Sequence, residues 1–200
     1  MLQIENLNSS LFGPLSLSVA AGECVSIVGA SGSGKSLFLR AIADLDPNEG
    51  SVRLNGKARS EMSADKWRKR VALVPSESGW WTDDVGDHFE FCENPAPLLA
   101  AVRLQEALGW HVSRLSSGEK HRLAIVRAIC AAPEVILLDE PTATLDQAAT
   151  MLVEDLIRAQ CERGAAVILV THDQAQSERL ASRRYQMVKG TLVPVAEAVS

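Results

Sequence analysis

Residues 29–36 read Gly-Ala-Ser-Gly-Ser-Gly-Lys-Ser, and this stretch decides the fold. It matches G-x-x-x-x-G-K-[ST], the pattern of a loop that cradles the phosphates of a nucleotide. Its glycines let the backbone wrap a phosphate chain, and the helix that follows aims its positive end at the same phosphates. The Lys35 ammonium can reach the β and γ phosphates, and the Ser36 hydroxyl can ligate Mg²⁺. The expected nucleotide contacts are Gly29, Ala30, Ser31, Gly32, Ser33, Gly34, Lys35, Ser36 and Leu37.

The residues on either side of this loop supply the context that the pattern requires. The apolar run Cys24–Val28 predicts a strand before the loop, and a helix is expected after it, to about Ala43. A flexible loop rich in glycine and serine could match the pattern by chance, without that strand and helix. The flanking residues therefore favour the phosphate-binding interpretation.

Strands and helices alternate along most of the chain. Apolar runs predict strands at Leu2–Leu7, Leu15–Val19, Gly50–Leu54, Val71–Val74, Val135–Asp139 and Ala165–Thr171. Helices are expected from about Ser117 to Ala131, at Ala148–Arg163 and from Asp173, and a hairpin joins Gln186–Lys189 to Leu192–Val195. This order predicts the α/β class, with a mostly parallel core sheet, an N-terminal antiparallel β part and a small helical insert. Parallel sheets bind ligands at the carboxyl ends of their strands.

The composition fits one folded domain. The 200 residues are 46% hydrophobic, which makes disorder unexpected. A formal net charge of -5 argues against a general nucleic-acid binder, because binding to a duplex needs a basic face. The four cysteines are scattered without a CxxC spacing, so we expect neither a zinc site nor a disulfide framework, and the pattern favours a reduced, cytosolic compartment.

Neither a signal peptide nor a membrane span is indicated. The N-terminus, MLQIENLNSS, lacks the basic and apolar regions of a leader. The longest apolar runs, such as residues 165–170, have the length of buried strands. A role at a membrane would therefore require a partner.

Two acids end a second apolar strand, Val135–Asp139. The Asp139 carboxylate can hold Mg²⁺, and that of Glu140 can polarise the attacking water or accept its proton. Two ordinary acids at a strand end would look the same, so this motif is weak alone. It gains weight because a phosphate loop precedes it.

Leu115-Ser-Ser-Gly-Glu119 opens the next predicted helix, and any helix could use its Ser116-x-x-Glu119 as a capping box. Its place in a series is more specific. Five segments occur along the chain in a fixed order: the phosphate loop, Leu115–Glu119, Asp139-Glu140, the segment ending at Asp146, and Thr171-His-Asp173. In that order the sequence resembles the ATP-binding cassette (ABC) ATPases, P-loop NTPases that power transporters. LSSGE resembles their LSGGQ signature, and residues 143–146 resemble their D-loop.

The resemblance implies a mechanism that needs two ATPase domains. ATP would lie between the phosphate loop of one domain and the signature of the other, in a head-to-tail dimer, here a homodimer. Ser116 and Gly118 would contact the γ phosphate across the interface, where Asp146 would also lie. His172 would contact the γ phosphate and hold the attacking water, with Glu140 and Lys35 as the other catalytic residues. As a lone histidine, His172 could equally be a satisfied residue at a strand end.

The sequence departs from the family's pattern after Val74. Family members usually carry a glutamine there, which approaches Mg²⁺, but this chain has Ser76. Glu77 could substitute as a metal ligand, or it could be a solvated surface carboxylate. Hydrolysis coupling is therefore in doubt more than ATP binding.

Two further stretches look shortened. Residues 80–114 correspond to the family's helical subdomain, which docks the membrane partner, within a single ABC ATPase domain at 1–200. Trp80 and Trp81 could anchor that partner or pack in the domain's own core. Ahead of the phosphate loop, Phe12 could stack on adenine or be a core residue before a turn.

Three functions remain open at this level. The first is the ATP-hydrolysing motor of a transporter, peripheral on the cytoplasmic face of the membrane through an integral-membrane permease. The second is an ABC ATPase that acts on a macromolecule, although the expected long coiled coil or second cassette is absent from this sequence. The third is a regulatory module that holds ATP with little turnover.

Overall fold

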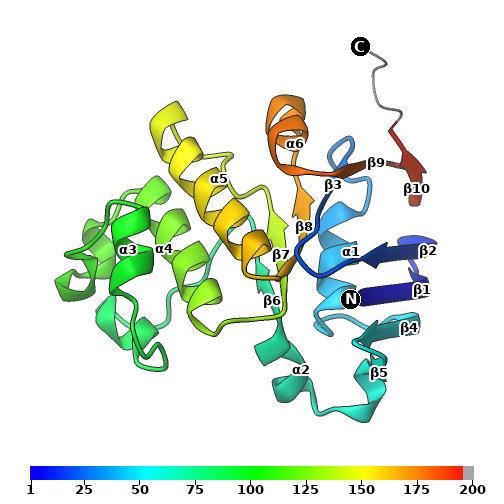
Figure 1. Cartoon of the computed structure of the whole chain (residues 1–200), viewed down its shortest axis with the longest axis horizontal. Coiled ribbons are helices and arrows are strands. Elements are labelled where there is room, and N and C mark those ends of the chain that lie inside the picture. The colour runs from blue at the N-terminus through cyan, green and yellow to red at the C-terminus, as the bar shows by residue number, and fades with distance from the viewer. Residues whose placement is uncertain (196–200) are drawn as a thin grey trace.

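The computed structural model describes residues 1–195 of the chain. Its α-helices are α1 (Lys35–Ile42), α2 (Ala64–Arg70), α3 (Ala96–Ala101), α4 (Ser117–Cys130), α5 (Gln147–Glu162) and α6 (Gln174–Leu180). Its ten strands form two sheets. Figure 1 shows α1 between these sheets, with α3, α4 and α5 on the opposite side of the larger one.

The larger sheet carries the site. Its order is β10 (Thr191–Pro194), β9 (Arg183–Val188), β3 (Cys24–Val28), β8 (Ala166–Val170), β7 (Val135–Asp139) and β6 (Val71–Val74). All neighbours are parallel except β9 and β10, which form the expected terminal hairpin. The central strands β7 and β8 are fully buried and, except for Asp139 at the end of β7, apolar, because helices or the second sheet cover both faces. The mostly parallel core sheet predicted from the sequence is confirmed.

Alternation along these strands divides the interior in two. On β7, Val135 and Leu137 face a core shared with α1 and the smaller sheet. Ile136 and Leu138 face a second core shared with α4, α5 and the insert. Side chains alternate between the faces of a strand, so each strand joins both cores. The carboxyl ends of the strands are thereby fixed relative to the helices that follow them.

The smaller sheet is antiparallel, as predicted. Its order is β2 (Phe12–Val19), β1 (Leu2–Ser9), β4 (Glu49–Leu54) and β5 (Lys57–Ala58). Asn55 and Gly56 turn β4 into β5 with φ of 51° and 80°, the left-handed conformation that a two-residue hairpin turn requires. The sheet covers α1 and so supports the helix that follows the phosphate loop.

The insert between β6 and α4 contains one α-helix, α3, and short 3₁₀ turns at Gly86–Phe89, Ala107–Gly109 and Val112–Arg114. A small helical insert was expected there, and the chain uses tighter 3₁₀ turns for most of it. Its apolar side chains, such as Val85 and Leu99, belong to the core of α4 and α5. No helix was expected at α2, which is held in place by burial of Trp67 and by the hydrogen bond from its indole N–H to the Ile42 carbonyl, 2.9 Å.

One expectation about the cysteines is wrong. Cys92 in the insert and Cys130 at the end of α4 form a disulfide, with their Cα atoms 5.3 Å apart. The two residues are 38 positions apart, and only the packing of the insert against α4 brings them together. Cys24 and Cys161 are free. Within residues 1–195, no helix combines the length and the apolar character needed to cross a membrane.

Candidate functional site

The phosphate loop joins β3 to α1 at the carboxyl edge of the larger sheet. Gly29 and Gly34 have φ of 155° and 102°, which L side chains rarely adopt. A Cβ at Gly29 would lie 2.7 Å from the Met187 carbonyl oxygen, so a side chain is excluded there. A cavity of about 390 Å³ opens over the loop. It is lined by Gly29, Ser31, Gly32, Ser33, Gly34, Lys35, Ser36, Leu37, Ser76, Asp139, Glu140 and His172.

The cationic group of this cavity is Lys35. Its side chain is buried, and its ammonium donates to the carbonyl oxygens of Gly29 and Ala30, at 2.8 and 3.0 Å. The charge is therefore held inside the curve of the loop, at the N-terminus of α1, where an anion is favoured. Among the predicted contacts at residues 29–37, only Ala30 does not line the cavity. Its carbonyl oxygen instead accepts from the Lys35 ammonium.

The residues fit a divalent cation as well. Asp139 is only 6% exposed, lines the cavity and accepts no hydrogen bond from the residues that the structure describes. A buried carboxylate without a partner is costly, so a cation on this side chain would stabilise it. The Ser36 hydroxyl lines the same cavity and is a second oxygen ligand of the kind that Mg²⁺ prefers.

Glu140 and His172 lie together beside these groups. The imidazole Nδ1 of His172 is 2.7 Å from Glu140 Oε2, and the His172 backbone N–H donates to the same oxygen at 3.3 Å. Glu140 has φ of 52°, an uncommon conformation for a residue with a side chain, found often at functional sites. The His172 side chain is 70% exposed, so it is not packed away as a structural strand-end residue.

The signature residues lie elsewhere. Ser116 is the N-cap of α4, where its hydroxyl accepts from the Glu119 N–H at 3.2 Å and its own N–H donates to the Glu119 carboxylate at 2.9 Å. The hydrogen bond from the Ser116 N–H, together with one from the Ser116 hydroxyl at 2.8 Å, holds the pKa of the Glu119 carboxyl below its usual range. A Cβ at Gly118 would lie 3.2 Å from a methyl group of Leu145, so α4 packs closely on the turn after β7. Neither Ser116 nor Gly118 lines the phosphate cavity.

Asp146 also lies outside the cavity. Its carboxylate caps α5 by accepting from the Ala149 N–H at 2.8 Å, and the residue is exposed. A surface carboxylate at this position is available to a second chain.

Two predicted contacts are corrected by the structure. Phe12 is 5% exposed and packs edge to face on Phe38, with ring centroids 5.8 Å apart, so it is a core residue and offers no face to a base. Ser76, and not Glu77, lines the phosphate cavity, and Glu77 is exposed. The structure therefore does not support Glu77 as a metal ligand.

Sequence reasoning missed an apolar residue beside the loop. Leu11 is 69% exposed, and its carbonyl oxygen would lie 3.7 Å from a Cβ at Gly34. An exposed leucine between a serine and a phenylalanine gives no distinctive signal in a sequence, since single exposed apolar residues are common.

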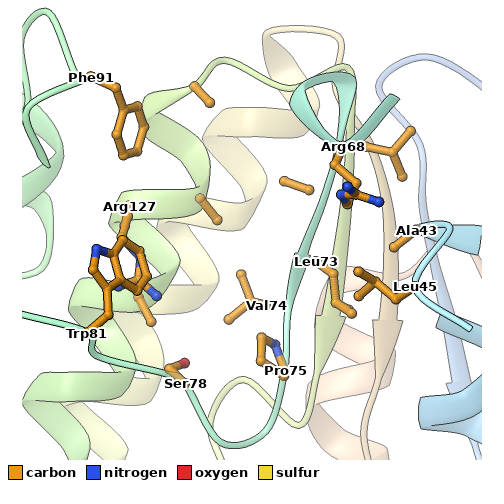
Figure 2. A pocket seen from close by; sticks show the side chains of 15 residues that line it. Ala43, Leu45, Arg68, Leu73, Val74, Pro75, Ser78, Trp81, Phe91 and Arg127 are labelled. Atoms are coloured by element: carbon orange, nitrogen blue, oxygen red, sulfur yellow. The ribbon is translucent and has the colours of Figure 1, made fainter. Parts of the chain in front are cut away.

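A second hollow lies between β6, α4 and the insert. It measures about 370 Å³, and Figure 2 shows Trp81 and Arg127 on one wall, facing Leu45 and Arg68. Trp81, Phe91 and Leu45 at its rim are 68%, 57% and 42% exposed. Together they form an apolar surface whose exposure to water is unfavourable. The Arg127 guanidinium lies over the rings of Trp81 and Trp80, at 4.6 and 4.9 Å from their centroids. We call this hollow the β6–α4 groove.

The fold and the cavity define a nucleotide-hydrolysing P-loop protein. A family model described as ABC transporter matches residues 12–143. Among curated proteins, the chain is 37% identical to the lipoprotein-releasing system ATP-binding protein LolD of Bordetella avium, over 90% of this chain and 86% of that one. It is 36% identical to the aliphatic sulfonates import ATP-binding protein SsuB 2 of Agrobacterium fabrum, over 90% of this chain and 71% of that one.

A solved structure of an ATP-binding subunit of an ABC transporter superimposes with a TM-score of 0.90, covering 98% of this chain and 90% of that one. At 23% identity, this likeness shows the fold. The chain belongs to the ABC transporter family and is an ATP-binding subunit with ATPase activity.

Proposed function

We propose that this chain hydrolyses MgATP in a head-to-tail dimer and so drives a separate integral-membrane permease. The pairing of Glu140 with His172 beside the phosphate loop carries the proposal. In this proposal Glu140 would serve as the general base and His172 as the orienting side chain, both beside the γ phosphate of a nucleotide on the loop.

The chemistry is an in-line displacement. A water oxygen attacks the γ phosphorus, the bond from that phosphorus to the β–γ bridging oxygen breaks, and ADP leaves. Glu140 accepts the proton of the water, and His172 holds Glu140 and the γ phosphate in position. Lys35 stabilises the negative charge on the phosphate oxygens. Mg²⁺, held by Ser36 and Asp139, would neutralise charge on the β and γ phosphates when bound.

A single chain leaves this site open on one side. The signature residues Ser116 and Gly118 do not line the cavity of their own chain, and Asp146 is exposed near them. A second copy, turned head to tail, would bring the N-terminus of its α4 to the γ phosphate, where a helix end favours an anion. The homodimer then holds two nucleotides, each between two chains.

The β6–α4 groove is the surface on which the permease would dock. Its rim exposes Trp81, Phe91 and Leu45, and tryptophan is frequent at the centres of protein interfaces. Pro75 and Ser78 line the groove on either side of Ser76, which lines the phosphate cavity, so a change at the nucleotide could reach the partner along a few residues. Such docking would place the chain on the cytoplasmic face of the membrane, and its net charge of -5 argues against nucleic acid as the partner.

The docking can be tested by immobilising the tagged chain and passing over it detergent-solubilised membranes from the cells that produce it. We expect a multi-spanning protein to be retained, and Trp81→Ala and Phe91→Ala each to reduce its retention without changing the ATPase rate of the purified chain. Met151→Ala is the matched control, because Met151 is an exposed apolar residue on α5, away from the groove. Equal retention by all four proteins would rule out the groove, and the absence of any membrane protein would favour an ABC ATPase that works without a permease.

A further inference from the structure

Gln176, in the first turn of α6, is a fully buried polar residue that has no part in the mechanism above. Its side-chain Nε2 donates to the Thr142 hydroxyl at 2.8 Å. Its Oε1 finds no donor among the residues that the structure describes. Neither Gln176 nor Thr142 lines the phosphate cavity. A leucine would fill a similar volume without leaving an amide oxygen unpaired, so packing alone does not account for a glutamine here.

The Gln176–Thr142 hydrogen bond joins the same two loops as the Glu140–His172 pair. Thr142 follows Glu140 by two residues, in the turn after β7, and Gln176 follows His172 by four. The segments after β7 and β8 are therefore linked twice, once in the open cavity and once outside it. The second link is partly buried, because Gln176 is buried and Thr142 is half-buried, and a hydrogen bond with less access to water is electrostatically stronger.

The start of α6 is anchored on its other side as well. Ser177 shares a buried hydrogen bond with Ser26 of β3, the strand that leads into the phosphate loop, with the hydroxyl oxygens 2.5 Å apart. Asp173 caps the helix by accepting from the Gln176 N–H at 3.1 Å. Because α6 is held to β3 by Ser177, the Gln176 amide is a fixed point against which the turn after β7 is placed.

That turn continues to the dimer-facing Asp146. The Leu145 N–H donates to the Thr142 carbonyl at 3.0 Å, and Leu145 in turn packs next to Gly118 of the signature. A displacement of Thr142 would thus move Glu140 on one side and the segment leading to Asp146 on the other.

We propose that Gln176 is a positioning residue for ATP hydrolysis: through Thr142 it sets the place of Glu140 relative to His172 and ties that pair to the Asp146 segment. It contacts no substrate. The proposal rests on the proposed function in one respect, which is that Glu140 and His172 serve hydrolysis.

The test is a double-mutant cycle on the steady-state ATPase of the purified chain. We expect Gln176→Leu and Thr142→Val each to lower kcat by roughly 3- to 30-fold, with KM for ATP changed less than about twofold. The double variant should be no slower than the slower single variant, because both changes remove the same hydrogen bond. Thr142→Ser keeps the hydroxyl and should retain nearly the original kcat.

Gln160→Leu is the matched control. Gln160 is another buried glutamine, but it lies near the end of α5 beside Ala165, at the opposite edge of the sheet. This variant should keep its kcat whatever its melting temperature. Multiplicative loss of kcat in the double variant, or a melting-temperature change with unchanged kcat in both single variants, would overturn the positioning role.

A second readout separates this proposal from the ATPase assignment. In the nucleotide-free protein, Gln176→Leu and Thr142→Val should move the imidazole ¹⁵N resonances of His172, assigned with a His172→Gln variant, whereas Gln160→Leu should not. If the original chain failed to hydrolyse ATP, the proposed function would fall, and shifted His172 resonances would still support the link from Gln176. Resonances unchanged in both variants would refute it.

Discussion

The two helix N-termini that are proposed to face phosphates, those of α1 and α4, are built in opposite ways. α1 begins after Gly34 with no side-chain cap and no acidic residue in its first turn. α4 begins after Ser116 with a complete capping box and with Glu119 in its first turn. Both ends carry the positive pole of a helix, but only the α4 end has a side-chain cap and an acidic residue in its first turn.

The difference suggests two kinds of phosphate contact. The N-terminus of α1, with Lys35 buried beside it, is prepared for an anion before any arrives. At the N-terminus of α4, the Glu119 carboxylate already accepts from the Ser116 N–H, and this glutamate stands where the family signature has glutamine. A γ phosphate approaching from a second chain would meet that negative charge. We infer that the first contact binds nucleotide and the second is conditional, made only when the dimer closes.

Removing the Lys35 ammonium at the N-terminus of α1 should have the largest effect on ATP turnover. Lys35→Ala should lower ATP turnover by more than about 1,000-fold, because no other charge on the loop offsets the charge of the transferring phosphate. A phosphate-release assay on the purified chain measures it. Lys57→Ala, which removes an exposed lysine on β5, should leave turnover unchanged. Turnover retained in Lys35→Ala would break the assignment of this end as the nucleotide site.

A variant that cannot hydrolyse ATP, but keeps the N-termini of α1 and α4 intact, should accumulate as the ATP-bound dimer. Glu140→Gln should lower turnover by about 100-fold or more, because an amide cannot accept the proton of water. It should still bind ATP and elute as a dimer in size exclusion with MgATP. A variant that stays monomeric with MgATP would contradict closure by a second copy of this chain.

Removing the negative charge at the N-terminus of α4 should have a smaller effect, and it should strengthen dimerisation. Glu119→Gln keeps the cap but removes one negative charge from the α4 N-terminus, a change worth about 0.3–1 kcal/mol. We therefore expect MgATP-dependent dimerisation to tighten by roughly two- to fivefold per site, with the gain shrinking at high salt. Analytical ultracentrifugation at two salt concentrations measures it. Weaker dimerisation would show that the carboxylate assists closure.

The smallest effect should be on the stability of α4 against acid. Hydrogen bonds from Ser116 lower the pKa of Glu119 in the folded chain, so the charged carboxylate stabilises the fold above the ordinary pKa of 4.5. This contribution is lost as the pH falls through the lowered pKa. Urea unfolding of Glu119→Gln should accordingly depend less on pH below about 4.5 than that of the original chain. If the free energy of unfolding depended on pH in the same way in both proteins, Glu119 would not contribute to the acid sensitivity of the fold.

The sequence predicted the parts of the site that one short segment can specify. The phosphate loop, the acids after β7 and the capping box of α4 each depend on neighbouring residues, and the structure has all three in the predicted elements. The contact between Glu140 and His172 was not predicted; it arises because the two residues follow the neighbouring parallel strands β7 and β8.

The errors arose where a role depends on distant contacts. Whether Phe12 faces a base or the core depends on Phe38, which lies 26 positions later. Whether Ser76 or Glu77 faces the cavity depends on how the chain leaves β6, which the strand pattern does not define.

By itself, then, the sequence determined the α/β class, the order of most strands and helices, and the phosphate-binding chemistry, because local periodicity and short motifs encode these. Only the tertiary structure decided the rest. It joined Cys92 to Cys130, buried Phe12 and gathered the apolar rim of the β6–α4 groove. It also linked Gln176 to Thr142. The physical reason is that each of these contacts joins residues far apart in the chain, and only the packing of helices on the sheet brings them within reach of one another.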